Sequence, residues 1–160
     1  MLKKYKKHVE ERAEQNIPPL PLDADQTSEL IELLKKDHQE SDFLLNLLKE
    51  RVPAGVDQAA YVKAAFLADI TTGKASSPYI TKIDAVKILG TMLGGYNIQP
   101  LIECLKDNEL AEAAAHVLSR TLLIFDAFNE IFELSKTNEH AKKVVEEWAN
   151  ATWFTEKTDI

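Results

Sequence analysis

Apolar residues recur at intervals of three and four positions along almost the whole chain, and this spacing limits the fold most. Residues at such intervals lie on one face of an α-helix. We find no convincing run in which apolar and polar residues alternate strictly, as they do in a half-buried β-strand. The residues that most often interrupt helices are scarce, with 5 Gly and 6 Pro among 160 residues. The sequence therefore predicts an all-α protein.

Capping signals and loop residues divide the chain into about nine helices. Asp23 with Gln26 and Thr81 with Asp84 have the form of capping boxes, although Thr27 is an alternative cap for the first of these helices. Single N-caps are predicted at four further positions, namely Ser41, Asp57, Asn97 and Asn108. These signals predict helices over residues 2–15, 23–36, 43–51, 57–70, 81–93, 97–105, 108–118, 125–132 and 141–148, with a break between Ser119 and Thr121.

The loops between these predicted helices are short, which favours antiparallel neighbours. Nine helices are too many for a simple bundle, whereas a stack of helix pairs accommodates them. No sharp repeat of 34 to 47 residues is present, so the stack is expected to be irregular. We predict a single domain over residues 1–160, an irregular HEAT-like α-α superhelix of about nine antiparallel-stacked helices.

The net charge and the distribution of apolar residues exclude some classes of partner and of cellular location. The chain carries 26 acidic and 19 basic side chains, a net charge of −7, which opposes nucleic-acid binding as a global mode. The basic N-terminus reaches no apolar core before Glu10 and Glu11, unlike a secretory signal. No run approaches the roughly 18 to 20 apolar residues that span a bilayer. We expect a cytoplasmic protein with no membrane partner.

The residues that usually carry catalysis or bind metals are scattered. The four His residues fall on or beside four different predicted helices, and none follows a Glu three positions earlier, as a di-iron bundle requires. Glu112 and His116 are one turn apart, a spacing more typical of a helix contact than of a metal site. Ser119 and Asp126 follow His116, but Ser119 is predicted inside a helix and lacks the strained turn of a nucleophile. A hydrolase is therefore not favoured.

Cys104 is the only cysteine and lies among apolar neighbours, so we interpret it as a small buried side chain. One thiolate cannot hold an iron–sulfur cluster or a Cys-rich zinc site. We therefore expect no catalytic residue, no metal ligand and no cofactor in this chain.

Two segments are candidates for an interaction surface. Gly94 and Gly95, followed by Tyr96 and Asn97, either present backbone N–H groups to an anion or simply end one helix and begin the next, and the second reading is favoured. The other segment holds Trp148, Trp153 and Phe154, which are either core residues or a docking surface.

Several segments, taken together, resemble a known family. Residues 51–64, 88–102, 118–128 and 148–154, with Tyr5 to His8 and Pro21 to Ala24, are similar in order and spacing to the N-terminal HEAT-like domain of bacterial aconitase B, the aconitate hydratase 2 family. The similarity covers essentially the whole chain, and the segment from Gly94 to Asn97 is its most specific part.

The resemblance implies a parent enzyme that interconverts citrate and isocitrate through cis-aconitate, and often acts on 2-methylaconitate, with a four-iron four-sulfur cluster. The cluster and substrate ligands of that family belong to later domains, and no position here inherits them. The resemblance implies protein–protein contact for this domain: packing on the catalytic domains of the same enzyme, shaping substrate access, dimerisation, and regulatory RNA binding.

Other interpretations remain open at this point. The chain is an excised domain, a gene fragment, or a free-standing helical-repeat adaptor without enzyme activity. RNA binding through Lys3, Lys4, Lys6 and Lys7 is less favoured than a solvated helix face, because the chain is acidic overall. Enzymatic activity of the chain by itself is the least favoured hypothesis.

Overall fold

The fold is seen in a computed structural model, which describes residues 1–121 and 126–151. Within these ranges there are nine α-helices and one π-helical segment, and the β-type pairing is a single bridge between Ser77 and Ile80. The all-α prediction is confirmed. The elements are α1 (Leu2–Glu14), α2 (Ala24–Leu34), α3 (Ser41–Asn46), η1 (Leu47–Arg51), α4 (Gln58–Thr72), α5 (Lys82–Leu89), α6 (Ile98–Cys104), α7 (Ala111–Leu118), α8 (Ala127–Ser135) and α9 (Glu139–Ala149).

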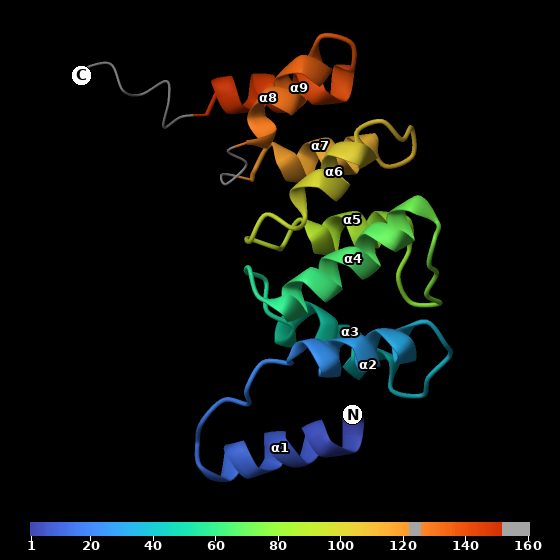
Figure 1. Ribbon diagram of the computed structural model, residues 1–160, viewed down its shortest axis with the longest axis vertical. Helices are drawn as coiled ribbons and strands as arrows, with labels where there is room; N and C mark the ends of the chain where they lie inside the picture. Colours follow the sequence, from blue (N-terminus) through green and yellow to red (C-terminus); the bar gives the residue numbers. More distant parts are fainter. Residues whose placement is uncertain (122–125, 152–160) are drawn as a thin grey trace, which may run out of the picture.

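The helices form an elongated stack, with α1 at one end and α8 and α9 at the other (Figure 1). Successive loops lie on alternate sides of the stack, so consecutive helices run in opposite directions. Packing follows the same order, since α2 lies on α4, α4 on α5, α5 on α7, and α7 on α9. Each helix thus contacts mainly its near neighbours along the chain.

A continuous apolar core runs between these helices. The Leu-rich segment that ends in η1 lies inside, with Leu44, Leu47 and Leu48 buried. On α4 the small side chains Ala60 and Ala64 are buried, which lets the α2 and α5 backbones approach closely. Each fully buried Leu in such a core stabilises the fold by roughly 1.5 to 3 kcal/mol relative to exposure.

Local capping accounts for many of the helix starts. The capping boxes of Asp23 with Gln26 and of Thr81 with Asp84 are both present, which confirms the predictions. The predicted cap Asp57 accepts a hydrogen bond from the backbone N–H of Ala60. The break after α7 is also confirmed, because that helix ends at Leu118.

Two other cap predictions were wrong, and a third was right in position only. Ser41 is already the first residue of α3, and Glu40 occupies the cap position. Asn108 does not cap α7, because Oδ1 of Asp107 accepts the backbone N–H groups of Glu109 and Leu110 instead. Asn97 precedes α6, but its side chain makes no capping hydrogen bond.

One predicted helix end and one predicted buried face also need correction. The helix that begins after Thr81 ends at Leu89, not at residue 92 or 93, and Gly90 follows it. On α8 only Ile131 is buried, whereas the predicted pattern also placed Phe128 and Phe132 on the apolar face. The fourth residue of that pattern, Phe125, lies outside the described residues.

Helix α1 is attached to the rest of the stack by apolar contacts, by ion pairs and by hydrogen bonds of Tyr5. The Tyr5 hydroxyl donates to the carbonyl oxygen of Leu20 at 3.1 Å and accepts from Nε of Arg51 at 3.2 Å. Arg51 also donates to the carbonyl of Pro19. Arg51 is the last residue of η1, so these bonds join the loop between α1 and α2 to the end of the α3–η1 segment.

Candidate interaction surface

The loops 52–57 and 90–97 pack directly against each other. The backbone N–H of Leu93 donates to the carbonyl oxygen of Ala54 at 2.8 Å. A Cβ atom on Gly94 would lie 2.0 Å from the carbonyl oxygen of Gly55, so only glycine fits here. Gly95 adopts the left-handed conformation, with φ of 91°, which also favours glycine. The glycine pair therefore serves the contact between two loops.

Tyr96 fastens this junction from the outside. Its hydroxyl donates to the carbonyl oxygen of Val56 at 3.0 Å, and its ring meets the ring of Tyr61 edge to face, with the centroids 5.4 Å apart. Val56 and Leu93, at the tips of the two loops, are 74% and 72% exposed. Their backbones are fixed while their side chains face solvent.

Asn97 lies beneath this surface, with only 1% of its area exposed. Its amide nitrogen donates to the carbonyl oxygens of Leu89 and Met92, at 2.9 and 3.1 Å. Leu89 is the last residue of α5, and its carbonyl also accepts from the backbone N–H of Met92, so the buried amide joins the end of α5 to the turn that follows it. The role of Asn97 is thus to close the end of α5. Its Oδ1 has no partner among the described residues.

The predicted C-terminal aromatic site is a small stack on α8 and α9. The ring of Trp148 lies 5.7 Å from that of Phe128, and Phe132 is stacked beyond at 6.3 Å. The indole N–H of Trp148 donates to the carbonyl oxygen of Leu118 at 3.2 Å, which fixes α9 to the end of α7. Phe128 and Phe132 are 44% and 45% exposed. Trp153 and Phe154 lie outside the described residues.

The structure does not bring the two predicted segments together. Gly94 to Asn97 form the loop between α5 and α6, whereas Trp148 lies on α9, beyond α6 and α7 in the stack (Figure 1). They are therefore two separate surface features. The sequence pattern did not single out Val56, and it placed Leu93 at the end of a predicted helix. The available signal was that each of these residues lies beside a glycine, Gly55 or Gly94.

A buried lysine between α4 and η1 was also missed. Lys63 on α4 is fully buried, and its ammonium group lies 3.5 Å from the carbonyl oxygen of Lys49 in η1. Burial lowers the pKa of Lys63 to about 8, and the nearby carboxylate of Glu50 partly opposes that shift. Its signal was a lysine on the inward face of an apolar helix, in line with Ala60 and Leu67.

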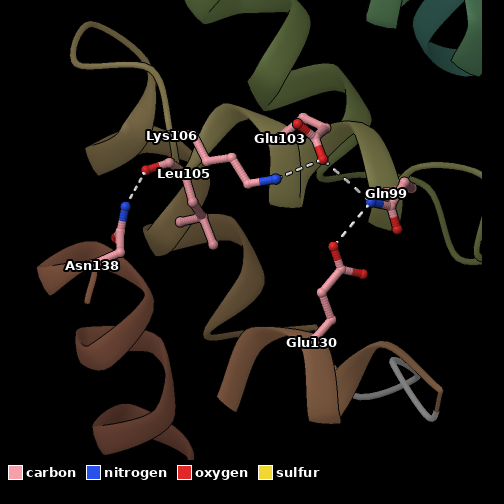
Figure 2. A network of polar contacts seen from close by, with 6 residues as sticks. All are labelled: Gln99, Glu103, Leu105, Lys106, Glu130 and Asn138. Atoms are coloured by element: carbon pink, nitrogen blue, oxygen red, sulfur yellow. Dashed lines mark hydrogen bonds and ion pairs between the residues drawn. The ribbon is translucent and has the colours of Figure 1, made fainter. Parts of the chain in front are cut away.

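On the opposite side of the stack, loops are joined by side chains (Figure 2). Nδ2 of Asn138 donates to the carbonyl oxygen of Leu105 at 2.8 Å, while its Oδ1 caps α9 by accepting from the N–H of Ala141. Toward the other ends of these helices, the amide of Gln99 in the first turn of α6 donates to Glu130 in the first turn of α8 at 3.2 Å, which links α6 to α8. The exposed ion pair of Lys106 with Glu103 completes the network.

Among the described residues, the candidate reactive side chains make local contacts. The Ser119 hydroxyl donates to the carbonyl oxygen of His116, and the imidazole of His116 contacts Arg120 rather than Glu112. Cys104 is buried as predicted, and burial raises the pKa of its thiol. In the part of the chain that the structure describes, no group of three His, Cys, Asp or Glu residues is arranged to hold a metal ion.

An iron–sulfur cluster does not fit the residues of this chain. Such a cluster is held by several cysteine thiolates, and Cys104 is the only cysteine in the sequence. Desolvation of its thiol further disfavours the thiolate.

Of the basic N-terminal residues, Lys6 is paired with Glu40 and Lys7 with Glu11. None of the described helices combines the length and the apolar character needed to cross a bilayer.

Comparison with known proteins assigns the chain. The Aconitate B N-terminal domain family matches residues 4–154. The chain is 56% identical over 156 residues to aconitate hydratase B of Escherichia coli, 53% over 163 residues to that of a Synechocystis strain, and 48% over 161 residues to that of Helicobacter pylori.

These alignments cover 96%, 100% and 99% of this chain but only 18%, 19% and 19% of the relatives. The chain thus spans less than a fifth of the length of the proteins it matches. The resemblance inferred from residues such as Gly94 to Asn97 is confirmed. The chain belongs to the Aconitate B N-terminal domain family.

Proposed function

We propose that this chain is the non-catalytic N-terminal module of an aconitate hydratase B, and that it packs against the catalytic portion of that enzyme. In this role it shapes the approach of substrate and leaves the hydration of aconitate to the other domains. The observation that carries the proposal is the alignment of essentially the whole chain with less than a fifth of each relative.

The chemistry of the chain supports a role in packing. Its one cysteine is buried, Ser119 and His116 are engaged locally, and the described residues hold no metal-binding group. Its exposed apolar side chains gather at loop tips and on α8. Exposed apolar clusters of this kind mark contacts with other protein surfaces.

A chimera tests the proposal. The segment of Escherichia coli aconitate hydratase B that matches this chain is replaced by this chain, and a second protein has the segment deleted. We expect the chimera to hydrate aconitate at about the rate of the parent, and small-angle X-ray scattering to show the module held against the remainder. The deleted protein should be slower or less stable, because interdomain burial is lost.

The proposal fails if scattering shows the module swinging freely in an active chimera. It also fails if the deleted protein matches the parent in both turnover and thermal stability. Aconitate turnover by the isolated chain, after incubation with iron and sulfide, would overturn the non-catalytic assignment.

A second candidate is homodimer contact through the aromatic stack of Phe128, Phe132 and Trp148. It is favoured by the exposure of two stacked rings beside each other. Sedimentation equilibrium of the isolated chain should then show a dimer that Phe132→Ser dissociates. A monomer at all concentrations would exclude this contact for the isolated chain.

RNA binding has weaker support, because two of its four candidate lysines, Lys6 and Lys7, are ion-paired.

A further inference from the structure

The two sides of the stack differ in what their loops expose. We call loops 15–23, 52–57 and 90–97 the apolar edge, and loops 35–40, 73–81, 105–110 and 136–138 the polar edge; they lie on the left and right of Figure 1. Among the described residues, the apolar edge exposes Ile17, Leu20, Val56 and Leu93, and Tyr61 in the first turn of α4 adjoins it.

The polar edge has no exposed large apolar side chain in its loops. Its apolar residues turn inward, as Ile80, Leu105 and Leu110 do. Two exposed ones lie beside it on helices, Ile83, 43% exposed in the first turn of α5, and Phe132, 45% exposed in the last turn of α8 and covered in part by Lys136. The contrast is therefore a property of the loops on each side and not of the chain as a whole.

Charge is distributed in the opposite sense. The loops of the polar edge carry nine charged side chains, namely Lys35, Lys36, Asp37, Glu40, Lys74, Lys106, Asp107, Glu109 and Lys136. Those of the apolar edge carry two, Asp23 and Asp57, and both side chains accept a hydrogen bond at a helix N-terminus. The described residues of the loop between α7 and α8, on the same side of the stack, add two exposed charges, Arg120 and Asp126, and Arg120 lines a pocket with Leu93. Few charges at the apolar edge would therefore need to be desolvated on contact.

The apolar edge is also preorganised. The bond from the N–H of Leu93 to Ala54 and the bond from the hydroxyl of Tyr96 to Val56 hold loops 52–57 and 90–97 together. Near the other end, Tyr5 and Arg51 bond to the carbonyls of Leu20 and Pro19. Loops held in this way lose little conformational entropy on binding.

We infer that the apolar edge is the face that docks on the catalytic portion of the same enzyme, an inference that rests on the function proposed above. The relatives contain more than four-fifths of their length outside the matched region, which supplies a large protein surface as the occupant. An edge that extends along several helix pairs suits a broad protein contact better than a small ligand.

Hydrogen exchange in the chimera tests this assignment. Backbone amides of loops 52–57 and 90–97 should exchange about tenfold more slowly in the chimera than in the isolated chain, because docking limits local opening. Amides of the polar-edge loops should exchange equally in both. The double substitution Val56→Lys with Leu93→Lys should abolish the extra protection and release the module in scattering.

Ile83→Lys is the matched control, since it places the same charge on an exposed apolar position beside the polar edge. It should leave both measurements unchanged. Urea unfolding of the isolated variants checks that they fold. The pattern of hydrogen-exchange protection in the unmutated chimera is measured without any substitution and does not depend on that check.

The outcomes separate the two proposals. If the unmutated chimera is compact but protection falls on the polar edge, or if only Ile83→Lys releases the module, the apolar edge is not the docking face, although the proposed function stands. If the unmutated chimera is not compact, the proposed function itself fails. Concentration-dependent protection of the apolar edge in the isolated chain would instead assign it to a second copy of this chain.

Discussion

The stack joins its loops in two different ways, one on each edge. Between loops 52–57 and 90–97 the contact is made by backbone, because Gly94 lets the chain lie against Gly55. Between loops 105–110 and 136–138 it is made by the side chain of Asn138 (Figure 2). A backbone junction leaves the neighbouring side chains free to face outward. The first junction therefore exposes apolar side chains to solvent. The second joins its loops through the polar side chain of Asn138.

The largest effect is expected from breaking the backbone junction. Gly94→Ala places a Cβ against the carbonyl of Gly55, and backbone yields less easily than a side chain. We expect a loss of about 3 kcal/mol in the free energy of unfolding, measured by urea denaturation. Gly55→Ala is the control, since nothing lies within 4 Å of its added Cβ, and it should change stability by less than about 0.5 kcal/mol. Equal effects of the two substitutions would contradict this account of the junction.

Removal of the buried charge on Lys63, between α4 and η1, should increase stability. Lys63→Met removes an ammonium group that has only the distant carbonyl of Lys49 as a hydrogen-bond partner. We expect the free energy of unfolding to rise by about 2 kcal/mol at pH 7. A matched substitution of an exposed lysine, Lys87→Met, should have little effect.

The pH dependence gives the sign of the Lys63 effect. The folded-state pKa of about 8 lies below the ordinary value of 10.5, so between these values the unfolded chain binds more protons. Stability of the unsubstituted chain should therefore rise from pH 8 to 10.5, and the advantage of Lys63→Met should shrink over the same range. An advantage that is independent of pH would show that packing, not charge, causes it.

The smallest effect is expected at the side-chain junction. Asn138→Ala removes the cap of α9 and the bond to the carbonyl of Leu105, so we expect a loss of about 1.5 kcal/mol in thermal or urea unfolding. Asn108→Ala is the control, because Asp107 makes the hydrogen bonds that the sequence pattern assigned to Asn108. A larger loss from Asn108→Ala than from Asn138→Ala would contradict the assignment.

Predictions of helix caps from the sequence succeeded where the two hydrogen-bonding residues are close in the chain. The boxes at Asp23 and Thr81 join residues three positions apart, and the same pattern identifies them in any setting. Asn97 shows why others failed: an amide beside a helix start is as able to cap that helix as to close the previous one. The choice depends on where α5 ends, which is decided by packing rather than by local sequence.

The candidate surface was predicted only in part. The importance of Gly94 and Gly95 was visible, but the reason, contact with a loop about 40 residues earlier, was not. Trp148 was identified, while the exposed rings of Phe128 and Phe132 were assigned to the apolar pattern. Apolar periodicity marks a helix face but does not say whether a neighbour covers it.

The sequence by itself determined the helical class, most helix starts, the burial of Cys104 and the family, because each depends on local hydrogen bonding, side-chain polarity or residue identity. Only the tertiary structure decided which loops meet, that Lys63 is enclosed, and that one edge of the stack is apolar. These features depend on the order and register in which helices stack. That register is a property of the whole core, not of any one segment.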